Sequence, residues 1–177
     1  MAQILVLWHS IIALLANFCN GTDRKYPKNI AGVDTEFRGF SGGTTETILR
    51  FLETPLPSKM KCVFLQIGGS DPCAGSYVSV ANNIERICKV LLQNGIEEVL
   101  VGTILPRKKS RGIEVAEYCN KKKVLKLLDE RFKDQERIVL CPYLNFRPKS
   151  WKADTTHFND KGNRLLYVDI RFHVKTK

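Results

Sequence analysis

The chain contains no C-x-x-C pair, although it has six cysteines: Cys19, Cys62, Cys73, Cys88, Cys119 and Cys141. A structural zinc site needs closely spaced thiolate or imidazole ligands, so this absence argues against one. Several of the cysteines lie inside apolar segments, where an unpaired thiol packs as a small hydrophobic group. We therefore expect reduced cysteines and no metal site.

The chain also lacks an apolar run long enough to cross a membrane. Residues 4–18 fall short of the roughly 20 residues that a span requires, and His9-Ser10 interrupts them. A secretory signal fits poorly, because no Lys or Arg precedes the run and Leu15-Ala16-Asn17-Phe18 is a poor cleavage site. The run is better interpreted as a buried strand from Ile4 to Trp8, a sharp turn and a helix from Ile11 to Phe18. This interpretation favours an intracellular protein.

Acidic residues are scarce relative to basic ones. The chain has 18 Asp and Glu against 28 Lys and Arg, a formal net charge of +10. Such an excess favours an anionic partner, for example nucleic acid, an anionic membrane or an anionic substrate, but it also fits a passive basic surface. The cations form short clusters at residues 107–111, 121–123 and 147–152. Short basic runs are weak signals, and no RNP-like aromatic motif or zinc finger accompanies them.

Apolar strands alternate with helical patterns along the 177 residues, a length that suits one domain over residues 1–177. This alternation is typical of a parallel sheet with helices on both faces. We therefore expect an α/β, flavodoxin-like three-layer fold with a five-stranded parallel sheet in the order 2-1-3-4-5. The expected strands are Ile4–Trp8, Ala31–Phe37, Cys62–Ile67, Glu98–Leu105 and Arg137–Cys141.

Helix signals fall between these strands. A glycine loop over residues 39–43 precedes Thr44, which is expected to cap the next helix. Apolar residues at helical spacing begin at Tyr77, and Asn94-Gly95 is expected to end that helix. A polar helix is expected over about residues 113–132, and a last helix should turn Leu166 and Ile170 inward.

A base for nucleophilic chemistry is available near the C-terminus. His157 follows Asp154 by three residues, so a loop can aim both into one site, with the carboxylate orienting the imidazole. A serine hydroxyl needs such a base to act as a nucleophile, and Ser10 follows the first expected strand. The alternative for His157 is a loop or capping histidine. The other two histidines are His9, beside Ser10, and His173, expected to pair with Asp169 on a helix surface.

Four short blocks, in this order, resemble those of the SGNH (GDSL-like) hydrolases, small flavodoxin-like serine esterases. They are Trp8-His9-Ser10, Ser41-Gly42-Gly43-Thr44, Gly68-Gly69-Ser70-Asp71 and Asp154-Thr155-Thr156-His157. No single block is specific, but all four stand at matching places in the expected fold. The resemblance extends from Ile4 to about Phe172.

The resemblance implies a metal-free and cofactor-free serine esterase acting on a small ester. Ser10 would attack the carbonyl carbon, His157 would carry the proton, and Asp154 would hold the imidazole. The oxyanion would be met by the backbone N–H groups of Ser10 and Gly42 and by the side chain at Ser70. Residues near the reacting ester would include Gly43, Gly69 and Asp71.

The sequence departs from the family pattern at two positions. Ser70 occupies the position of the family's oxyanion-hole Asn. A hydroxyl is shorter than a carboxamide, and the loss of one oxyanion donor lowers kcat by about 10²–10³-fold. Trp8 stands where the family has Gly before the nucleophile. These departures motivate the second interpretation, a catalytically weakened SGNH-fold module that binds an anionic partner such as nucleic acid through its basic surface.

Residues 39–43, Gly-Phe-Ser-Gly-Gly, also match the G-x-S-x-G nucleophile elbow of α/β-hydrolases, which would make Ser41 the nucleophile. That motif requires a strong strand immediately before it, and residues 33–38 are charged and weak. The glycines are better interpreted as allowing the backbone to approach a substrate.

Overall fold

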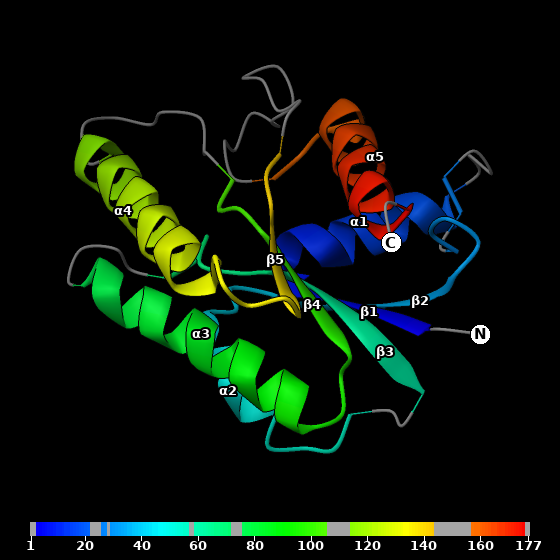
Figure 1. The fold of residues 1–177 in the computed structure, drawn as a ribbon. Helices are drawn as coiled ribbons and strands as arrows, with labels where there is room; N and C mark the ends of the chain where they lie inside the picture. Colours follow the sequence, from blue (N-terminus) through cyan, green and yellow to red (C-terminus); the bar gives the residue numbers. More distant parts are fainter. Residues whose placement is uncertain are drawn as a thin grey trace.

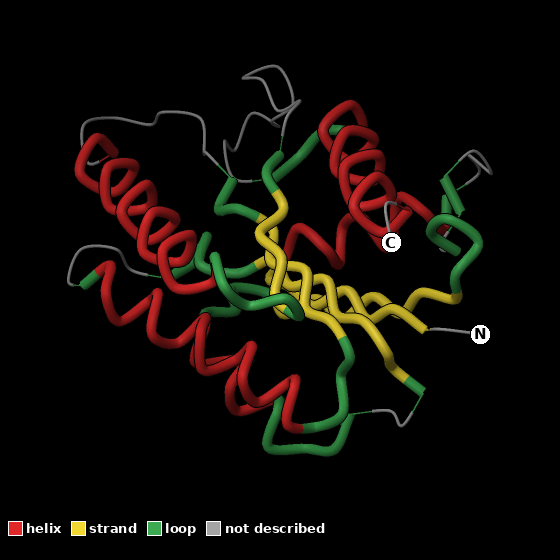
Figure 2. Tube along the Cα trace, in the orientation of Figure 1, coloured by secondary structure: helices red, strands yellow, loops and turns green. Residues whose placement is uncertain are grey.

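Five parallel strands form one sheet in the order β2-β1-β3-β4-β5, as predicted. The computed structural model describes residues 3–21, 26–27, 29–56, 59–71, 76–105, 114–143 and 157–175. Figures 1 and 2 show the sheet in the middle of the molecule, with helices above and below it. The strands are β1 (Gln3–His9), β2 (Asp34–Phe40), β3 (Met60–Gln66), β4 (Glu98–Gly102) and β5 (Ile138–Cys141).

In the described part of the chain, helices cover both faces of the sheet (Figure 1). The helices are α1 (Ser10–Asn20), α2 (Thr45–Phe51), α3 (Tyr77–Gln93), α4 (Glu114–Phe132) and α5 (Asp160–Lys175). Apolar side chains of α1 and α5 share one core cluster, and those of α2, α3 and described residues of α4 share the other. Of the described helices, none has the length and apolar character needed to cross a lipid bilayer.

The apolar N-terminal run forms the interior strand β1 and the helix after it, as predicted. Successive β1 side chains alternate between the two clusters: Leu5 and Leu7 face α2 and α3, whereas Ile4 and Val6 face α1 and α5. All four are at most 4% exposed. A strand covered on both faces must be apolar at every position, which explains the unbroken run.

The predicted strand over Ala31–Phe37 was misplaced by three residues. Ala31 and Gly32 form a turn with positive φ at both residues, and β2 runs from Asp34 through Gly39 and Phe40, which the sequence had suggested were loop. The reason is a close approach between α1 and β2. An ideal Cβ on Gly39 would lie 2.5 Å from the backbone nitrogen of Ala13, so only glycine fits beneath the first turns of α1.

Gly39→Ala is therefore expected to lower the free energy of unfolding by about 1–3 kcal/mol, because the added methyl group meets helix backbone that cannot rotate away. Urea unfolding followed by circular dichroism measures the change. Gly21→Ala is the matched control, since its Cβ would come no closer than 3.2 Å to a neighbouring atom. Equal loss in both variants would contradict the close-approach explanation.

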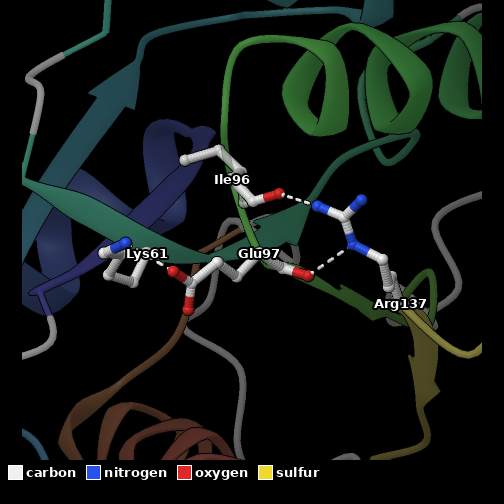
Figure 3. Close-up of polar contacts among 4 residues, drawn as sticks. All are labelled: Lys61, Ile96, Glu97 and Arg137. Atoms are coloured by element: carbon white, nitrogen blue, oxygen red, sulfur yellow. Dashed lines mark hydrogen bonds and ion pairs between the residues drawn. The ribbon is translucent and has the colours of Figure 1, made fainter.

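The amino ends of three strands are tied together at the sheet edge shown in Figure 3. The Arg137 guanidinium donates to the backbone carbonyls of Ile96 (2.5 Å) and Glu97 (2.9 Å), in the turn before β4. Lys61 of β3 pairs with the Glu97 carboxylate. The Lys61–Glu97 pair is exposed and contributes little, but the guanidinium satisfies two carbonyls of a turn and so helps to hold β4 in register.

Helix caps follow the sequence signals. Thr44 caps α2 in a reciprocal box with Thr47, in which the Thr44 N–H donates to Thr47 Oγ1 at 3.1 Å. Asn94 is the C-cap of α3, and Gly95 follows in the left-handed region with φ +87°. A glycine adopts that conformation without strain, so the predicted end of this helix is confirmed.

The described cysteines behave as core residues. Cys19, Cys88 and Cys141 are buried, and none of the described thiols forms a disulfide. Burial raises the pKa of the Cys88 thiol to about 12, with a smaller contribution from the nearby Glu85 charge. A thiol with so high a pKa stays protonated and packs as a hydrophobic group.

Candidate active site

Ser10 stands between two loops that carry predicted site residues, one with Gly42 and Gly43 and the other with Gly69 and Ser70. In the sheet β1 lies between β2 and β3, and its residue His9 pairs with Phe40 while Trp8 pairs with Gln66. Ser10 is the next residue along β1's path. Because parallel strands end at the same edge, the loops after Phe40 and Gln66 flank the Ser10 backbone.

The junction at Ser10 has no intervening loop. Strand β1 ends at His9, and helix α1 begins at Ser10 itself. Ile11, Ile12 and Leu15 are at most 2% exposed and fix the first turns of α1 against the sheet. The N-terminal end of a helix presents backbone N–H groups and a positive dipole end, an arrangement that favours developing negative charge.

The loop after β2 begins with a tight turn. The Gly43 N–H donates to the Phe40 carbonyl at 3.0 Å, and Gly42, the third residue of the turn, has φ +66°. Gly42 is exposed, whereas Gly43 is buried, and a Cβ on Gly43 would lie 2.9 Å from Phe40 Cβ. Both glycines are thus required by the turn, which follows the strand paired with β1.

Ser41 lies in this same turn and is exposed. Four residues, Ser41 to Thr44, separate the end of β2 from the start of α2. A nucleophile elbow needs a sharp strand-to-helix junction at the serine itself. That geometry exists at Ser10 and does not exist at Ser41.

The loop after β3 also needs a glycine at its start. Gly68 is buried with φ +88°, and a Cβ there would come 2.8 Å from Ile104 Cδ1. Gly69 and Ser70 follow, both half-buried. The loop therefore brings Ser70 to the same sheet edge as Ser10, where the sequence predicted the third oxyanion donor.

Asp71 ties the two flanking loops together. Its carboxylate accepts hydrogen bonds from the Thr45 backbone N–H (3.1 Å to either oxygen) and from Thr45 Oγ1 (2.5 Å). Asn83 Nδ2 donates to Thr45 Oγ1 at 3.0 Å and extends the network to α3. Asp71 is only 6% exposed. Burial raises the pKa of this carboxyl above its usual value, although the bonds from Thr45 act in the opposite direction.

The sequence assigned Asp71 to substrate contact, and that role stays a prediction. The contacts seen here give the carboxylate a structural task, since it joins the start of α2 to the loop that carries Gly69 and Ser70. Thr45 and Asn83 were missed by the sequence analysis. A Thr or Asn at a helix position gives no signal of a partner 26 or 38 residues away.

His157 stands just before α5. The neighbouring Phe158 is fully buried in the cluster beneath α1 and α5, and the side chain of Asn159 caps α5 by accepting from the Gly162 N–H at 3.0 Å. Buried Phe158 and the Asn159 cap thus fix the backbone position of His157, which is half-buried. Asp154, its predicted partner, lies outside the described residues.

A second polar cluster lies within the carboxyl end of the sheet, and the sequence did not reveal it. Gln66, only 1% exposed, donates through Nε2 to the Thr103 carbonyl at 3.0 Å and accepts from the Tyr143 hydroxyl. Burial, with the neighbouring Cys141 and Asp169, raises the pKa of Tyr143 well above its usual value. A Cβ on Gly102 would meet the Tyr143 hydroxyl at 2.5 Å. This cluster braces the strand that leads into the Ser70 loop.

Two further sequence expectations can be compared with the structure. The expected surface location of the Asp169–His173 pair was wrong, because Asp169 is only 5% exposed. His173 Nε2 lies 3.2 Å from the Pro142 carbonyl oxygen. The predicted basic clusters at 107–111 and 147–152 lie outside the described residues. Within the described ranges, no group of three or more His, Cys, Asp or Glu side chains could hold a metal ion.

One open hollow of about 360 Å³ lies between α2 and α3 and includes Glu46, Arg50, Asn83 and Arg86 among its lining residues. None of the predicted site residues lines it. The candidate site is therefore defined by the strand ends and not by this hollow.

No family model matches the chain, and no curated protein matches its sequence. Solved structures do match it over nearly its whole length. A GDSL-like lipase from Bacteroides thetaiotaomicron VPI-5482 is 18% identical with a TM-score of 0.78, covering 98% of this chain and 88% of that one. The lipase/acylhydrolase from Enterococcus faecalis is 20% identical with a TM-score of 0.77, covering 99% and 96%. A psychrotrophic esterase from Pseudoalteromonas sp. is 16% identical with a TM-score of 0.71, covering 99% and 98%.

At these identities the likeness establishes the fold. The chain has the three-layer α/β/α fold of SGNH (GDSL-like) lipases and esterases, as the four sequence blocks predicted.

Proposed function

We propose that this protein is a serine ester hydrolase of the SGNH type, a single esterase domain that cleaves small acyl esters of the acetyl type. The observation that carries the proposal is the direct junction of β1 and α1 at Ser10, between the loops of Gly42 and Ser70. The named activities of the structural neighbours support it, and one neighbour is an acetyl esterase solved with an acetate ion.

In the proposed mechanism the Ser10 hydroxyl attacks the ester carbonyl carbon while His157 accepts its proton. The tetrahedral oxyanion accepts hydrogen bonds from the backbone N–H groups of Ser10 and Gly42, at a helix N-terminus and a glycine turn, while Ser70 occupies the position of the family's third donor with a shorter side chain. Collapse of the intermediate expels the alcohol, which receives the proton from His157. Water then releases the acid by the same steps, and Asp154 keeps the imidazole oriented throughout.

The test is labelling with a fluorophosphonate, which forms a covalent bond only with an activated serine. A structural neighbour, the Pseudoalteromonas esterase, was solved inhibited by monoethylphosphonate. We expect mass spectrometry to find the label on Ser10, to lose it in Ser10→Ala and His157→Ala, and to retain it in the matched control Ser41→Ala.

Two other outcomes would overturn the proposal. Label on Ser41 that persists in Ser10→Ala would assign the nucleophile to the glycine loop. Absence of label on protein that is folded by circular dichroism would favour the second candidate, the weakened module that binds an anionic partner such as nucleic acid. The replacement of the family's Asn by Ser70 and the net charge of +10 are the observations behind that candidate.

A further inference from the structure

The outer face of α5 carries an unusual combination of side chains. Apart from Asp160 at its first position, every exposed residue of this helix is cationic or apolar. We call these residues the α5 stripe: Lys161, Arg164, Val168, Arg171, Phe172 and Lys175. Their spacing of three or four residues places them along one side of the helix.

The two apolar members of the stripe are not needed by the core. Val168 is 47% exposed and Phe172 is 56% exposed, and they adjoin each other at i, i+4 beside half-buried Leu165. The core contacts of α5 come from its opposite face, where Leu166 and Ile170 are fully buried. Phe172 contacts the His173 ring edge-to-face, with centroids 5.4 Å apart, and still leaves more than half of its surface exposed next to Val168. The two side chains thus form a small apolar patch within a basic helix face.

The charge of the stripe is strongly one-sided. Four cations lie along it, and Asp169, the other acid of α5, is buried on the inner face. Helix α1, which packs beside α5, contributes no charged residue. At a helical rise of about 1.5 Å per residue, the stripe is about 21 Å long.

We propose that the α5 stripe docks on an anionic phospholipid surface, with α5 lying in the plane of the interface. The four cations match negatively charged headgroups, and Val168 and Phe172 reach the acyl boundary. A nucleic acid is the less suitable partner for two reasons. Single strands follow concave basic grooves, whereas this face is a convex helix, and phosphates gain nothing from the aliphatic Val168.

The proposal is tested by co-sedimentation of the full chain with vesicles of phosphatidylcholine alone or enriched in phosphatidylserine. We expect binding to the phosphatidylserine vesicles at least tenfold stronger than to phosphatidylcholine. Arg171→Glu with Lys175→Glu should weaken it by at least about tenfold, since each cation near an anionic surface contributes strongly. Phe172→Ser should weaken binding several-fold while leaving the charge unchanged.

The matched control, the α4 charge variant, reverses Lys126 within α4 and Lys133 directly after its end (Lys126→Glu with Lys133→Glu), whose side chains are 81% and 69% exposed. It changes the net charge equally and should leave most of the vesicle binding intact. Ser10→Ala should bind vesicles like the wild type, which separates this surface from the proposed catalysis. Circular dichroism of each variant confirms that the fold is retained.

Three results would overturn the inference. One is equal loss of vesicle binding in the α4 and α5 charge variants, which would mean that only net charge matters. Another is the absence of any preference for phosphatidylserine. The third is that single-stranded RNA, but not vesicles, binds through Arg171 and Lys175, which would assign the stripe to nucleic acid.

Discussion

Ser70→Asn is expected to raise kcat for a small acetyl ester by about 10²-fold, because it restores an oxyanion donor of the kind whose loss costs 10²–10³. Ser70 lies half-buried after β3, in a loop that Gly68 starts and Asp71 holds against Thr45. A carboxamide on this braced loop extends further from the backbone than a hydroxyl does. The donor acts on charge that exists only in the transition state, so kcat should rise with little change in KM.

Steady-state hydrolysis of a chromogenic acetate ester measures this effect. Ser70→Ala is the matched control, which removes the hydroxyl without adding an amide and should not raise kcat. The gain must also vanish when Ser70→Asn is combined with Ser10→Ala. A Ser70→Asn protein that is folded, labelled at Ser10 and no faster than wild type would show that Ser70 is not at the oxyanion.

Asp71→Ala should lower the free energy of unfolding by about 2–3 kcal/mol, because it leaves two buried Thr45 donors without their acceptor. Thr45→Val removes only the hydroxyl and should cost less. Urea unfolding measures both variants. Asp134→Ala, at a carboxylate that is 83% exposed, is the control and should change stability little. A similar cost at positions 71 and 134 would contradict the bridging role.

The same carboxylate predicts a pH dependence with a defined sign. Burial raises the pKa of Asp71 in the folded protein above its unfolded value, so the folded state binds the proton more tightly. Its contribution to stability is therefore full below the ordinary carboxyl pKa and is lost as the pH rises through the raised pKa. Asp71→Asn should remove this component from the pH profile of the unfolding free energy, and Asp134→Asn should not.

Sequence patterns were reliable where burial or a local cap determines residue type. The run from Ile4 to Leu15 had to be apolar because β1 is covered on both faces and α1 packs against it. Thr44 and Gly95 mark helix ends because the Thr44 side chain caps α2 and because the left-handed backbone at position 95 favours glycine. In each case the cause lies within a few residues of the signal.

The remaining features depend on partners far away in the sequence. Gly39 was assigned to a loop, but it is a strand residue that must lack a side chain because Ala13 crosses over it. Gln66 is a polar residue within an otherwise apolar strand segment, and it is held by Thr103 and Tyr143. The periodicity of a sequence indicates which face of a helix or strand is buried. It does not indicate which segment, distant in the sequence, packs against that face.

By itself the sequence determined the alternation of strands and helices and the SGNH-like blocks, because burial on two faces and tight turns restrict residue types locally. Only the tertiary structure decided which loops flank Ser10, that Ser41 lacks an elbow, and that Asp71 is bound by Thr45. It also decided that Val168 and Phe172 share an exposed face with four cations. Those facts depend on register and packing, which bring together residues that no local pattern connects.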